Sequence, residues 1–391
     1  MGWGKDMLSE QIVAEERDDF PITRSGIYVN VAERGPLSLS VKAAVDRHLT
    51  DLMQTGGRKE EWFATTESVR ADFARLINAA PTEVAYVKNV SEGINAIANA
   101  FTWRSGDNVV IAAALEHPNN VFPWLNLRRL GVEVRVVEPV EERIDTPAVL
   151  ALLDERTRIV AVASATFAPG LRTDLDSLGT ACRERDIFLL VDGAQSVGVL
   201  HTDVAATRID GLVCSTSKGL LGLYGLGFLY CRADWARRLE PAYLARFGVD
   251  LGDAHESYTG ALEYTLLPDT RRFEIGNYNY AAIHAVEVSL KRLLRLGTRN
   301  IENHAVSLAQ RLAAGLRQRG LPVRANDPRW LGSIVCVGGS EDRAEVVDRF
   351  RQRLTENHVF LSVRRGTLRF SFHLYNTPAE VDRILDVAAA I

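Results

Sequence analysis

Short apolar runs alternate with amphipathic stretches between about residues 84 and 231. The apolar runs predict strands, and stretches with apolar residues at helical spacing predict helices. The predicted strands are Val84–Val87, Asn108–Ala112, Val132–Val137, Ile159–Ala163, Phe188–Val191, Leu212–Cys214 and Gly227–Cys231, and the predicted helices are Ser91–Phe101, Asn119–Leu130 and Asp174–Arg185. Such alternation predicts an α/β fold with a mostly parallel sheet covered by helices on both faces.

The pattern changes after Asn279, where long amphipathic helices come first and short strands follow. The expected elements are helices at Ala281–Leu296, Ile301–Arg319 and Arg343–Asn357 and strands at Ile334–Val337, Val359–Val363 and Thr367–Phe372. A last helix begins at Thr377, with Pro378 in its first position and Glu380 three residues after the cap. We therefore predict a large α/β domain over residues 25–285. A smaller α+β domain is predicted from residues 1–24 and 286–391.

Composition excludes several classes of protein. The 391 residues carry a net charge of −4, so the basic surplus of a nucleic-acid-binding protein is missing. The longest apolar run, Val109–Leu115, is too short to cross a bilayer, and the acidic N-terminal stretch is no secretory signal. The four cysteines are widely spaced, which argues against a disulfide framework or a metal site. We expect a cytoplasmic protein that binds neither membrane nor nucleic acid.

Four loops follow predicted strands, and all four carry polar or reactive residues. They are residues 88–93, 116–120, 192–196 and 215–219. In open α/β sheets, ligands bind beyond the carboxyl ends of the strands. The sequence therefore predicts that these loops form one site.

Lysine is scarce, with six residues against forty arginines. A Schiff base needs an amine that can lose its proton, which arginine cannot do. Only Lys88 and Lys218 follow buried strands, and Lys218 alone stands among small hydroxyl residues. A single such lysine is usually a surface charge, but the other three loops favour Lys218 as a Schiff-base residue, with Lys88 second.

Asp192 ends an apolar strand, where an unpaired carboxylate is costly to bury. It either caps a helix or pairs with a pyridinium nitrogen, which it would keep protonated so that the ring accepts electrons. Gln195 is within reach of a ring oxygen, and Ala194 is small enough to lie against the ring face. These three residues predict a pyridoxal-5'-phosphate (PLP) site.

The remaining candidates each have an ordinary structural alternative. Residues 89–93 precede a helix and suit a phosphate, although a plain serine cap fits too; Ser215 and Ser217 add hydroxyls. His117 either stacks on a planar cofactor and assists proton transfer or is a hydrogen-bonded loop histidine. Arg369, flanked by Leu368 and Phe370, presents a fork to a substrate carboxylate or is a surface charge.

Six segments occur in an order that is specific to one group of enzymes: VSEGIN, EHPNNVFPW, VDGAQSVG, STSKGLLGLYGLGFLY, RRFEIGNYN and LRFSFHLYNTPAEVDRI. With them the sequence resembles the class V aminotransferase superfamily of fold-type I PLP-dependent enzymes over nearly its whole length. Within it, the chain is similar to isopenicillin N epimerase-like proteins and to cysteine desulfurase and selenocysteine lyase relatives. The resemblance implies the fold-type I architecture, with a sheet of the seven-stranded type and a smaller C-terminal domain.

The resemblance also implies residue roles. Lys218 holds the cofactor as a Schiff base and is catalytic together with His117 and Asp192, while Arg369 binds the substrate carboxylate. The implied cofactor-binding residues are Val90, Ser91, His117, Asp192, Ala194, Gln195, Ser215, Ser217, Lys218, Gly276 and Asn277. The family forms homodimers, and Gly276 and Asn277 match the stretch that reaches the phosphate of the partner subunit.

The sequence departs from cysteine desulfurases at three places. Those enzymes carry a catalytic cysteine on a loop before the carboxylate-binding arginine, but here no cysteine follows Cys336, and Arg364 and Arg369 are five positions apart. Ser217 replaces the histidine common before the lysine. Ala168 and Pro169 stand in the loop where the family often has asparagine.

A desulfurase-like scaffold without its cysteine loop predicts β-elimination, a C–S lyase acting on cysteine or a cysteine S-conjugate. Two alternatives stay open from the sequence: epimerisation at Cα and transamination. A non-enzymatic PLP-binding regulator would need a DNA-binding segment, and no basic N-terminal extension is present.

Overall fold

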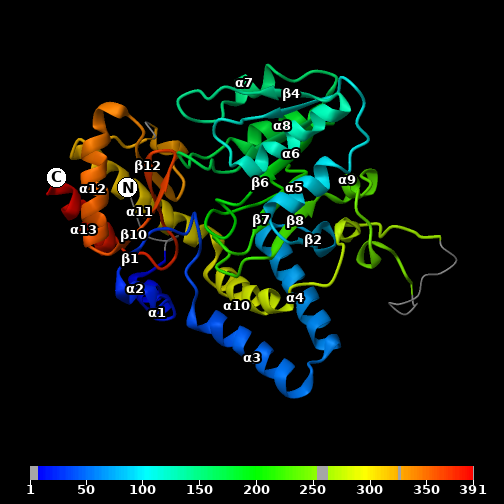
Figure 1. The fold of residues 1–391 in the computed structure, drawn as a ribbon, viewed down its shortest axis with the longest axis horizontal. Helices are drawn as coiled ribbons and strands as arrows, with labels where there is room; N and C mark the ends of the chain where they lie inside the picture. Colours follow the sequence, from blue (N-terminus) through cyan, green and yellow to red (C-terminus); the bar gives the residue numbers. More distant parts are fainter. Residues whose placement is uncertain (1–7, 253–262, 325–326, 391) are drawn as a thin grey trace.

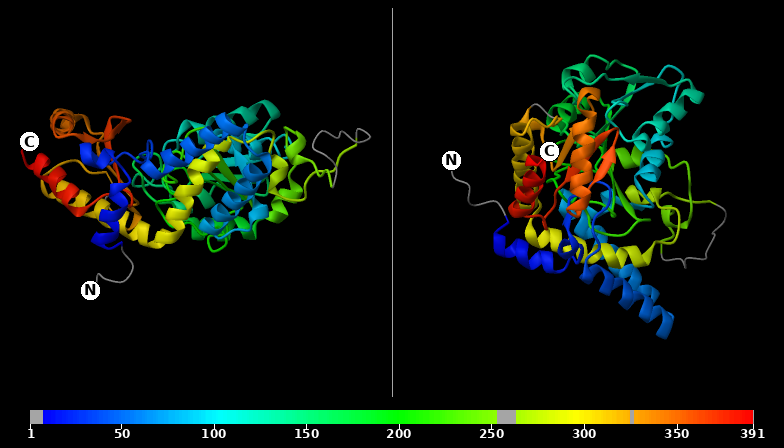
Figure 2. Two further views of the ribbon diagram at one scale, coloured as in Figure 1. Left: turned by 90° about the horizontal axis from the view of Figure 1, so that it is seen from below. Right: turned by 60° about the vertical axis from the view of Figure 1, so that its left-hand side comes forward.

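The computed structural model describes residues 8–252, 263–324 and 327–390. Figure 1 shows an elongated molecule, with a large part built around a central sheet and a smaller part that contains the end of the chain. Figure 2 shows the first two helices, α1 (Glu10–Asp18) and α2 (Ile22–Ser25), beside this smaller part. Helix α3 (Leu39–Thr55) projects from the body of the large part (Figure 1).

The central sheet has seven strands in the order β2-β8-β7-β6-β5-β3-β4. Its strands are β2 (Val84–Val87), β3 (Asn108–Ile111), β4 (Glu133–Val136), β5 (Thr157–Ala163), β6 (Phe188–Asp192), β7 (Gly211–Ser215) and β8 (Gly227–Cys231). Strand β8 runs antiparallel to both of its neighbours, and the remaining strands are parallel to one another. The predicted α/β class with a mostly parallel sheet is confirmed.

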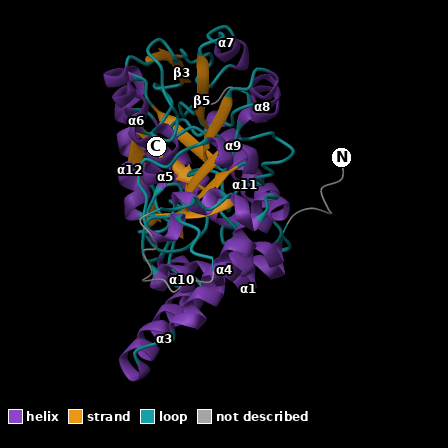
Figure 3. Ribbon diagram, turned by 90° about the vertical axis from the view of Figure 1, so that its right-hand side faces the viewer, coloured by secondary structure: helices purple, strands orange, loops and turns teal. Residues whose placement is uncertain are grey.

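Successive residues of each strand face opposite layers of helices, because side chains in a strand alternate between its two faces. In β5, Ile159 and Ala161 belong to one apolar core and Val160 and Val162 to another. The first core is completed by α5 (Val90–Ala98), α6 (Phe122–Asn126) and α9 (Ala233–Arg238); the second by α4 (Lys59–Ile77), α8 (Leu175–Glu184) and α10 (Tyr280–Leu296). Figure 3 shows the strands lying between these helices.

The smaller part contains a three-stranded antiparallel sheet and a third apolar core. The sheet has the order β11-β12-β9 and consists of β9 (Ile334–Gly338), β11 (Ser362–Arg364) and β12 (Thr367–Ser371). Helices α11 (Thr298–Gln318), α12 (Ala344–Glu356) and α13 (Pro378–Ala389) contribute to its core. Ile27 and Val29 also belong to this core, although the division predicted from the sequence gives them to the large domain. That division stays a prediction.

Two predicted elements were wrong in their extent. The helix expected over Asn119–Leu130 is broken into a 3-10 turn at Pro118–Asn120, the short α6 and a second 3-10 turn at Leu127–Leu130. Pro123, inside the expected range, lacks the N–H group that a continuous helix needs. The strand expected over Val359–Val363 is divided between two sheets, because β10 (Val359–Phe360) pairs with β1 (Ile27–Tyr28) whereas β11 pairs with β12.

The last helix begins as the sequence predicts. The Thr377 hydroxyl accepts a hydrogen bond from the Glu380 N–H at 3.2 Å, and the Glu380 carboxylate accepts one from the Thr377 N–H at 3.0 Å. Within the described ranges, no helix combines the length and the apolar character that crossing a membrane requires. Helix α7 (Thr146–Leu150) completes the set of α-helices.

Candidate active site

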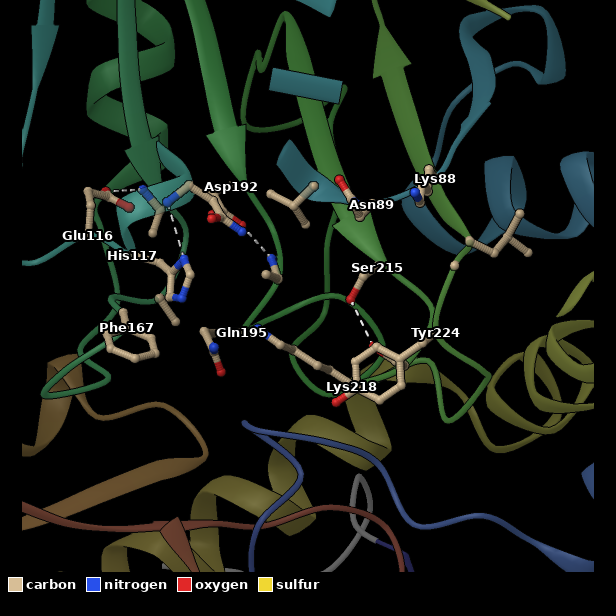
Figure 4. A pocket seen from close by; sticks show the side chains of 18 residues that line it. Lys88, Asn89, Glu116, His117, Phe167, Asp192, Gln195, Ser215, Lys218 and Tyr224 are labelled. Atoms are coloured by element: carbon tan, nitrogen blue, oxygen red, sulfur yellow. Dashed lines mark hydrogen bonds between the residues drawn. The ribbon is translucent and has the colours of Figure 1, made fainter. Parts of the chain in front are cut away.

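A cavity of about 250 Å³ opens at the carboxyl ends of the central strands. Figure 4 shows side chains from all four of the loops considered above pointing into it. The predicted site residues that line it are Val90, His117, Asp192, Ala194, Gln195, Ser215, Ser217 and Lys218, and Lys88 lines it too. The parallel strands bring these loops together, because their carboxyl ends share one edge of the sheet.

The charges of Asp192 and Lys218 influence each other across this cavity. Burial lowers the pKa of Lys218 to about 8, and the negative charge of Asp192 opposes that effect. Burial raises the pKa of Asp192. The hydrogen bond from the Ala194 N–H (2.8 Å) and the positive charge of Lys218 each lower it, but burial has the larger effect. An amine with such a pKa is neutral in an appreciable fraction of molecules near neutral pH, as a nucleophile or base requires.

Segments far away in the sequence hold the backbone around Lys218. The Gly35 N–H donates to the Ser217 carbonyl at 2.8 Å, and a side chain at Gly35 would come within 2.5 Å of the Lys218 carbonyl. His373 Nε2 lies 2.9 Å from the Gly219 carbonyl, and since a carbonyl only accepts, this nitrogen is the donor. The lysine loop is thus fixed from both sides by the chain before and after the large sheet.

The first turn of α5 lies beside the cavity. Asn89 caps this helix, because its side-chain oxygen accepts a hydrogen bond from the Glu92 N–H at 2.9 Å. The serine cap considered from the sequence was therefore wrong, and Ser91 does not line the cavity whereas Val90 does. Ser215 and Ser217 lie across from it with their hydroxyls 3.4 Å apart. A helix N-terminus beside two hydroxyls offers donors to a phosphate.

His117 lies at the end of the cavity away from α5 (Figure 4). Its Nδ1 accepts a hydrogen bond from the Asn119 N–H at 3.2 Å, which leaves Nε2 for another partner. Burial lowers the pKa of His117, and the positive charges of Lys218 and Arg369 lower it further. The imidazole is therefore neutral at neutral pH, which suits stacking on a planar ring.

Glu116 is a cavity residue to which the sequence analysis gave no role. It is fully buried, and its Oε1 accepts a hydrogen bond from the Ala163 N–H at 2.6 Å, while Oε2 has no partner among the described residues. Burial and the nearby charge of Asp192 raise the pKa of Glu116 to about 8, so this carboxyl is mostly protonated at neutral pH. In the sequence, only its position directly before His117 in a strand-end loop indicated that Glu116 could belong to the site.

Phe167 is the second residue that the sequence analysis missed. In the loop after β5, the cavity is lined by Ala165 and Phe167, and neither Ala168 nor Pro169 reaches it. The side chain that this loop turns toward the cavity is therefore that of Phe167, whereas the sequence analysis considered Ala168 and Pro169. Side chains of successive loop residues point in different directions, and only the fold reveals which one faces inward.

Three further predicted residues lie outside this cavity. Arg369 is 1% exposed and is held by Ser362 Oγ, which accepts from its Nε at 3.1 Å, and by the Phe167 carbonyl, which accepts from Nη1 at 3.2 Å. Gly276 and Asn277 line a neighbouring cavity of about 370 Å³, which shares Lys88, Gly225 and Leu226 with the first. Their contribution to a partner subunit's site stays a prediction.

All four cysteines are buried, and none lines the cavity. Burial raises the pKa of Cys336 to about 11, so its thiol is not ionised at neutral pH. Arg364 pairs with Thr367, so Arg365 and Gly366 alone connect β11 to β12. Both have positive φ, 49° and 72°, as a tight two-residue hairpin turn requires. This turn leaves no room for a loop that could carry a nucleophile into the cavity.

Comparison with known proteins gives consistent results. The family described as "Aminotransferase class-V" matches residues 39–384. A probable cysteine desulfurase of Methanothermobacter thermautotrophicus is 30% identical over 385 residues, which cover 93% of this chain and 94% of the relative. The apo cysteine desulfurase of Thermococcus onnurineus NA1 has a TM-score of 0.84 at 23% identity, covering 98% of this chain and 99% of that structure.

A further structure with the same fold is the complex of the cystine C–S lyase C-DES with its reaction product, cysteine persulfide. It has a TM-score of 0.83 at 22% identity and covers 95% of this chain and 99% of that one. The family match spans nearly the whole described part of the chain, from α3 to α13. This chain belongs to the class V aminotransferase family, whose members are PLP-dependent enzymes.

Proposed function

We propose that this enzyme is a C–S lyase, which catalyses β-elimination on cysteine or a cysteine S-conjugate with PLP carried by Lys218. Two features of the cavity together carry the proposal. The pKa of the Lys218 amine is lowered and the buried acid Asp192 lies in the same cavity, and none of the four cysteines lines that cavity. The first feature suits α-proton chemistry on an amino acid. The second argues that sulfur leaves as a free small molecule rather than as a persulfide on the protein.

The residues of the cavity fit the cofactor. Gln195 Oε1 and Glu116 Oε2 are buried there, and no residue in the described ranges forms a hydrogen bond with either oxygen. Such burial is costly unless a bound molecule supplies the partners. The Ala194 N–H occupies one oxygen of Asp192, so the other is available to a pyridine nitrogen. The phosphate would lie at the first turn of α5, near Ser215 and Ser217. His117 and Ala194 would cover the two faces of the ring.

Bound PLP supplies a ring that withdraws electrons from Cα of the attached amino acid. Lys218 Nζ would then remove the α-proton, for which a pKa of about 8 is well suited. Asp192 would keep the pyridine nitrogen protonated, and Arg369 would orient the substrate through its carboxylate. In the overall reaction, an S-conjugate and water give a thiol, pyruvate and ammonium, so no external oxidant or reductant is needed.

The relatives support cysteine as the substrate class, since two of those named above are cysteine desulfurases and a third is a cystine C–S lyase. The names of all three refer to breaking the C–S bond of a cysteine unit. No relative named above is an epimerase, so the comparisons do not favour the epimerisation considered from the sequence.

Product analysis on a panel of L-cysteine, L-cystine and S-conjugates tests the proposal. We expect the cofactor-loaded enzyme to release pyruvate, ammonium and a sulfur product in equal amounts from at least one of them, measured by mass spectrometry. The sulfur product is hydrogen sulfide from cysteine, cysteine persulfide from cystine and a thiol from an S-conjugate. A panel that yields no keto acid contradicts the proposal. Exchange of solvent deuterium into Cα of an otherwise intact amino acid would identify an epimerase, and dependence on a keto-acid acceptor would identify an aminotransferase.

Replacing Arg369 with alanine should raise KM for α-carboxylate substrates by about tenfold or more, with a smaller change in kcat. A hydrogen bond to a charged group contributes about 1.5–3 kcal/mol, and each 1.4 kcal/mol is tenfold in affinity. Steady-state kinetics on the best substrate of the panel measures this effect. The exposed pair of Arg311 and Asp382 provides a control, since Arg311→Ala removes an ion pair far from the site and should leave KM unchanged. An unchanged KM in Arg369→Ala would mean that the carboxylate binds elsewhere.

A further inference from the structure

The Phe167 side chain lines the cavity beside His117 and also contacts two arginines that lie outside it, Arg365 and Arg369. Its ring meets the His117 ring edge-on, with centroids 4.9 Å apart and planes at 77°. The guanidinium carbon of Arg369 lies 5.1 Å from the ring centroid, and that of Arg365 lies 5.7 Å from it. The Phe167 carbonyl also accepts the hydrogen bond from Arg369 Nη1. Phe167 thus touches Arg369 through both its backbone and its ring.

Arg369 is an unusual cation in this chain. Its side chain is almost completely buried, and no carboxylate of the described residues lies within ion-pair distance of it. The carboxylate whose negative charge acts on it is that of Glu33, which forms its ion pair with Arg364 instead. Burial lowers the pKa of Arg369 to about 10, which is still far above neutral, so the guanidinium keeps its charge. A buried charge without a partner is costly and normally recruits one. Here the groups that contact the guanidinium are neutral: the oxygens of Ser362 and Phe167 accept its hydrogen bonds, and the Phe167 ring lies beside it.

We propose that Phe167 is a positioning residue for Arg369. The Phe167 ring stabilises the buried guanidinium without occupying the donors that bind the substrate's α-carboxylate. The proposal rests on the function proposed above. An aromatic face attracts a cation through its π electrons and leaves the N–H groups at the guanidinium edge free. A carboxylate in the same place would take up those donors and compete with the substrate. Nη2 of Arg369 takes part in none of the hydrogen bonds between described residues.

The hairpin that carries Arg369 is tied to the same cavity wall. Arg365, in the turn of that hairpin, donates to the carbonyls of Ala114 and Glu116, the latter at 2.8 Å. The Phe167 N–H donates in turn to the Leu115 carbonyl at 3.1 Å. The ring of Phe167 therefore lies between two arginines of the smaller part and a loop of the large part. Removing the ring would loosen Arg369 while the backbone contacts remain.

The experiment measures binding of two non-eliminating ligands to the cofactor-loaded enzyme. L-alanine carries the α-carboxylate, and L-alaninamide carries the same amine without that charge. The change in absorbance of the bound cofactor on titration gives each Kd. The variants are Phe167→Leu, which keeps an apolar side chain but loses the aromatic face, and Phe167→Tyr, which keeps the face. Phe122→Leu is the matched control, since Phe122 is 66% exposed on α6 and does not line the cavity.

We expect Phe167→Leu to weaken L-alanine binding about tenfold and to leave the Kd of L-alaninamide within about twofold of wild type. Phe167→Tyr should restore the affinity for L-alanine, and Phe122→Leu should resemble wild type with both ligands. Equal weakening of both ligands in Phe167→Leu would overturn the proposal, because the residue would then only shape the cavity. Unchanged binding of L-alanine would overturn it as well. If the wild-type enzyme binds neither ligand, the proposed function itself fails.

Discussion

Replacing Lys218 with alanine is expected to remove the yellow absorbance of the bound cofactor and to lower activity by at least about a thousandfold, which corresponds to about 4 kcal/mol in activation free energy. The physical reason is that alanine has no amine, so in the role proposed for Lys218 the variant would lose both the covalent attachment of PLP and the base for the α-proton. The measurements are the absorbance spectrum of the purified variant after incubation with PLP and the rate of keto-acid release.

Lys88→Ala is the matched control for this prediction. Lys88 lines the same cavity and is the second candidate for the Schiff base, but it is exposed at the end of β2 and its backbone N–H bonds to Glu92. We expect the Lys88 variant to keep the yellow absorbance. The opposite result, with colour retained in Lys218→Ala and lost in Lys88→Ala, would assign the attachment to Lys88.

Replacing Asp192 with alanine should slow turnover by at least about a hundredfold, or about 2.7 kcal/mol in activation free energy. Without a carboxylate near the pyridine nitrogen, the ring no longer stays protonated and accepts electrons poorly from Cα. The affinity for PLP should also fall. Single-turnover rates at saturating PLP separate the slower chemistry from weaker cofactor binding.

Two variants of similar shape sharpen this second prediction. Asp192→Asn keeps the acceptor for the Ala194 N–H but removes the charge, and it should be nearly as slow as the alanine variant. Glu116→Gln is the counterpart within the same cavity. Because the pKa of Glu116 is raised to about 8, the native carboxyl is already mostly neutral at pH 7, and the amide should keep the rate within about threefold. A near-normal rate in Asp192→Ala would contradict the electron-withdrawing role.

The large part of the fold could be predicted because most of its strands are buried and are therefore nearly continuous in apolar residues. The pattern from β5 to β7 is an example: Ile159–Ala163 and Phe188–Val191 are apolar, and polar residues begin where each strand ends. In a parallel sheet, those ends meet at one edge. The grouping of Asp192 with Lys218 followed from that rule.

The rest depended on contacts between distant segments, which local patterns do not record. Phe360 and Ser362 are two residues apart but lie in different sheets, since one pairs with the strand at Tyr28 and the other with Arg369. Nothing near Phe167 in the sequence indicates that its ring would meet Arg369, 202 residues later. Glu116 is similar, because its partner is the N–H of Ala163 on another strand.

The hydrogen bond between His373 and the Gly219 carbonyl joins residues 154 positions apart and has a consequence for how the enzyme is made. A ribosome must synthesise the chain at least as far as His373 before the loop beside Lys218 has its full support. A nascent polypeptide that ends earlier holds the reactive amine on an incompletely fixed loop. Coenzyme capture should therefore be a late event in the maturation of this protein.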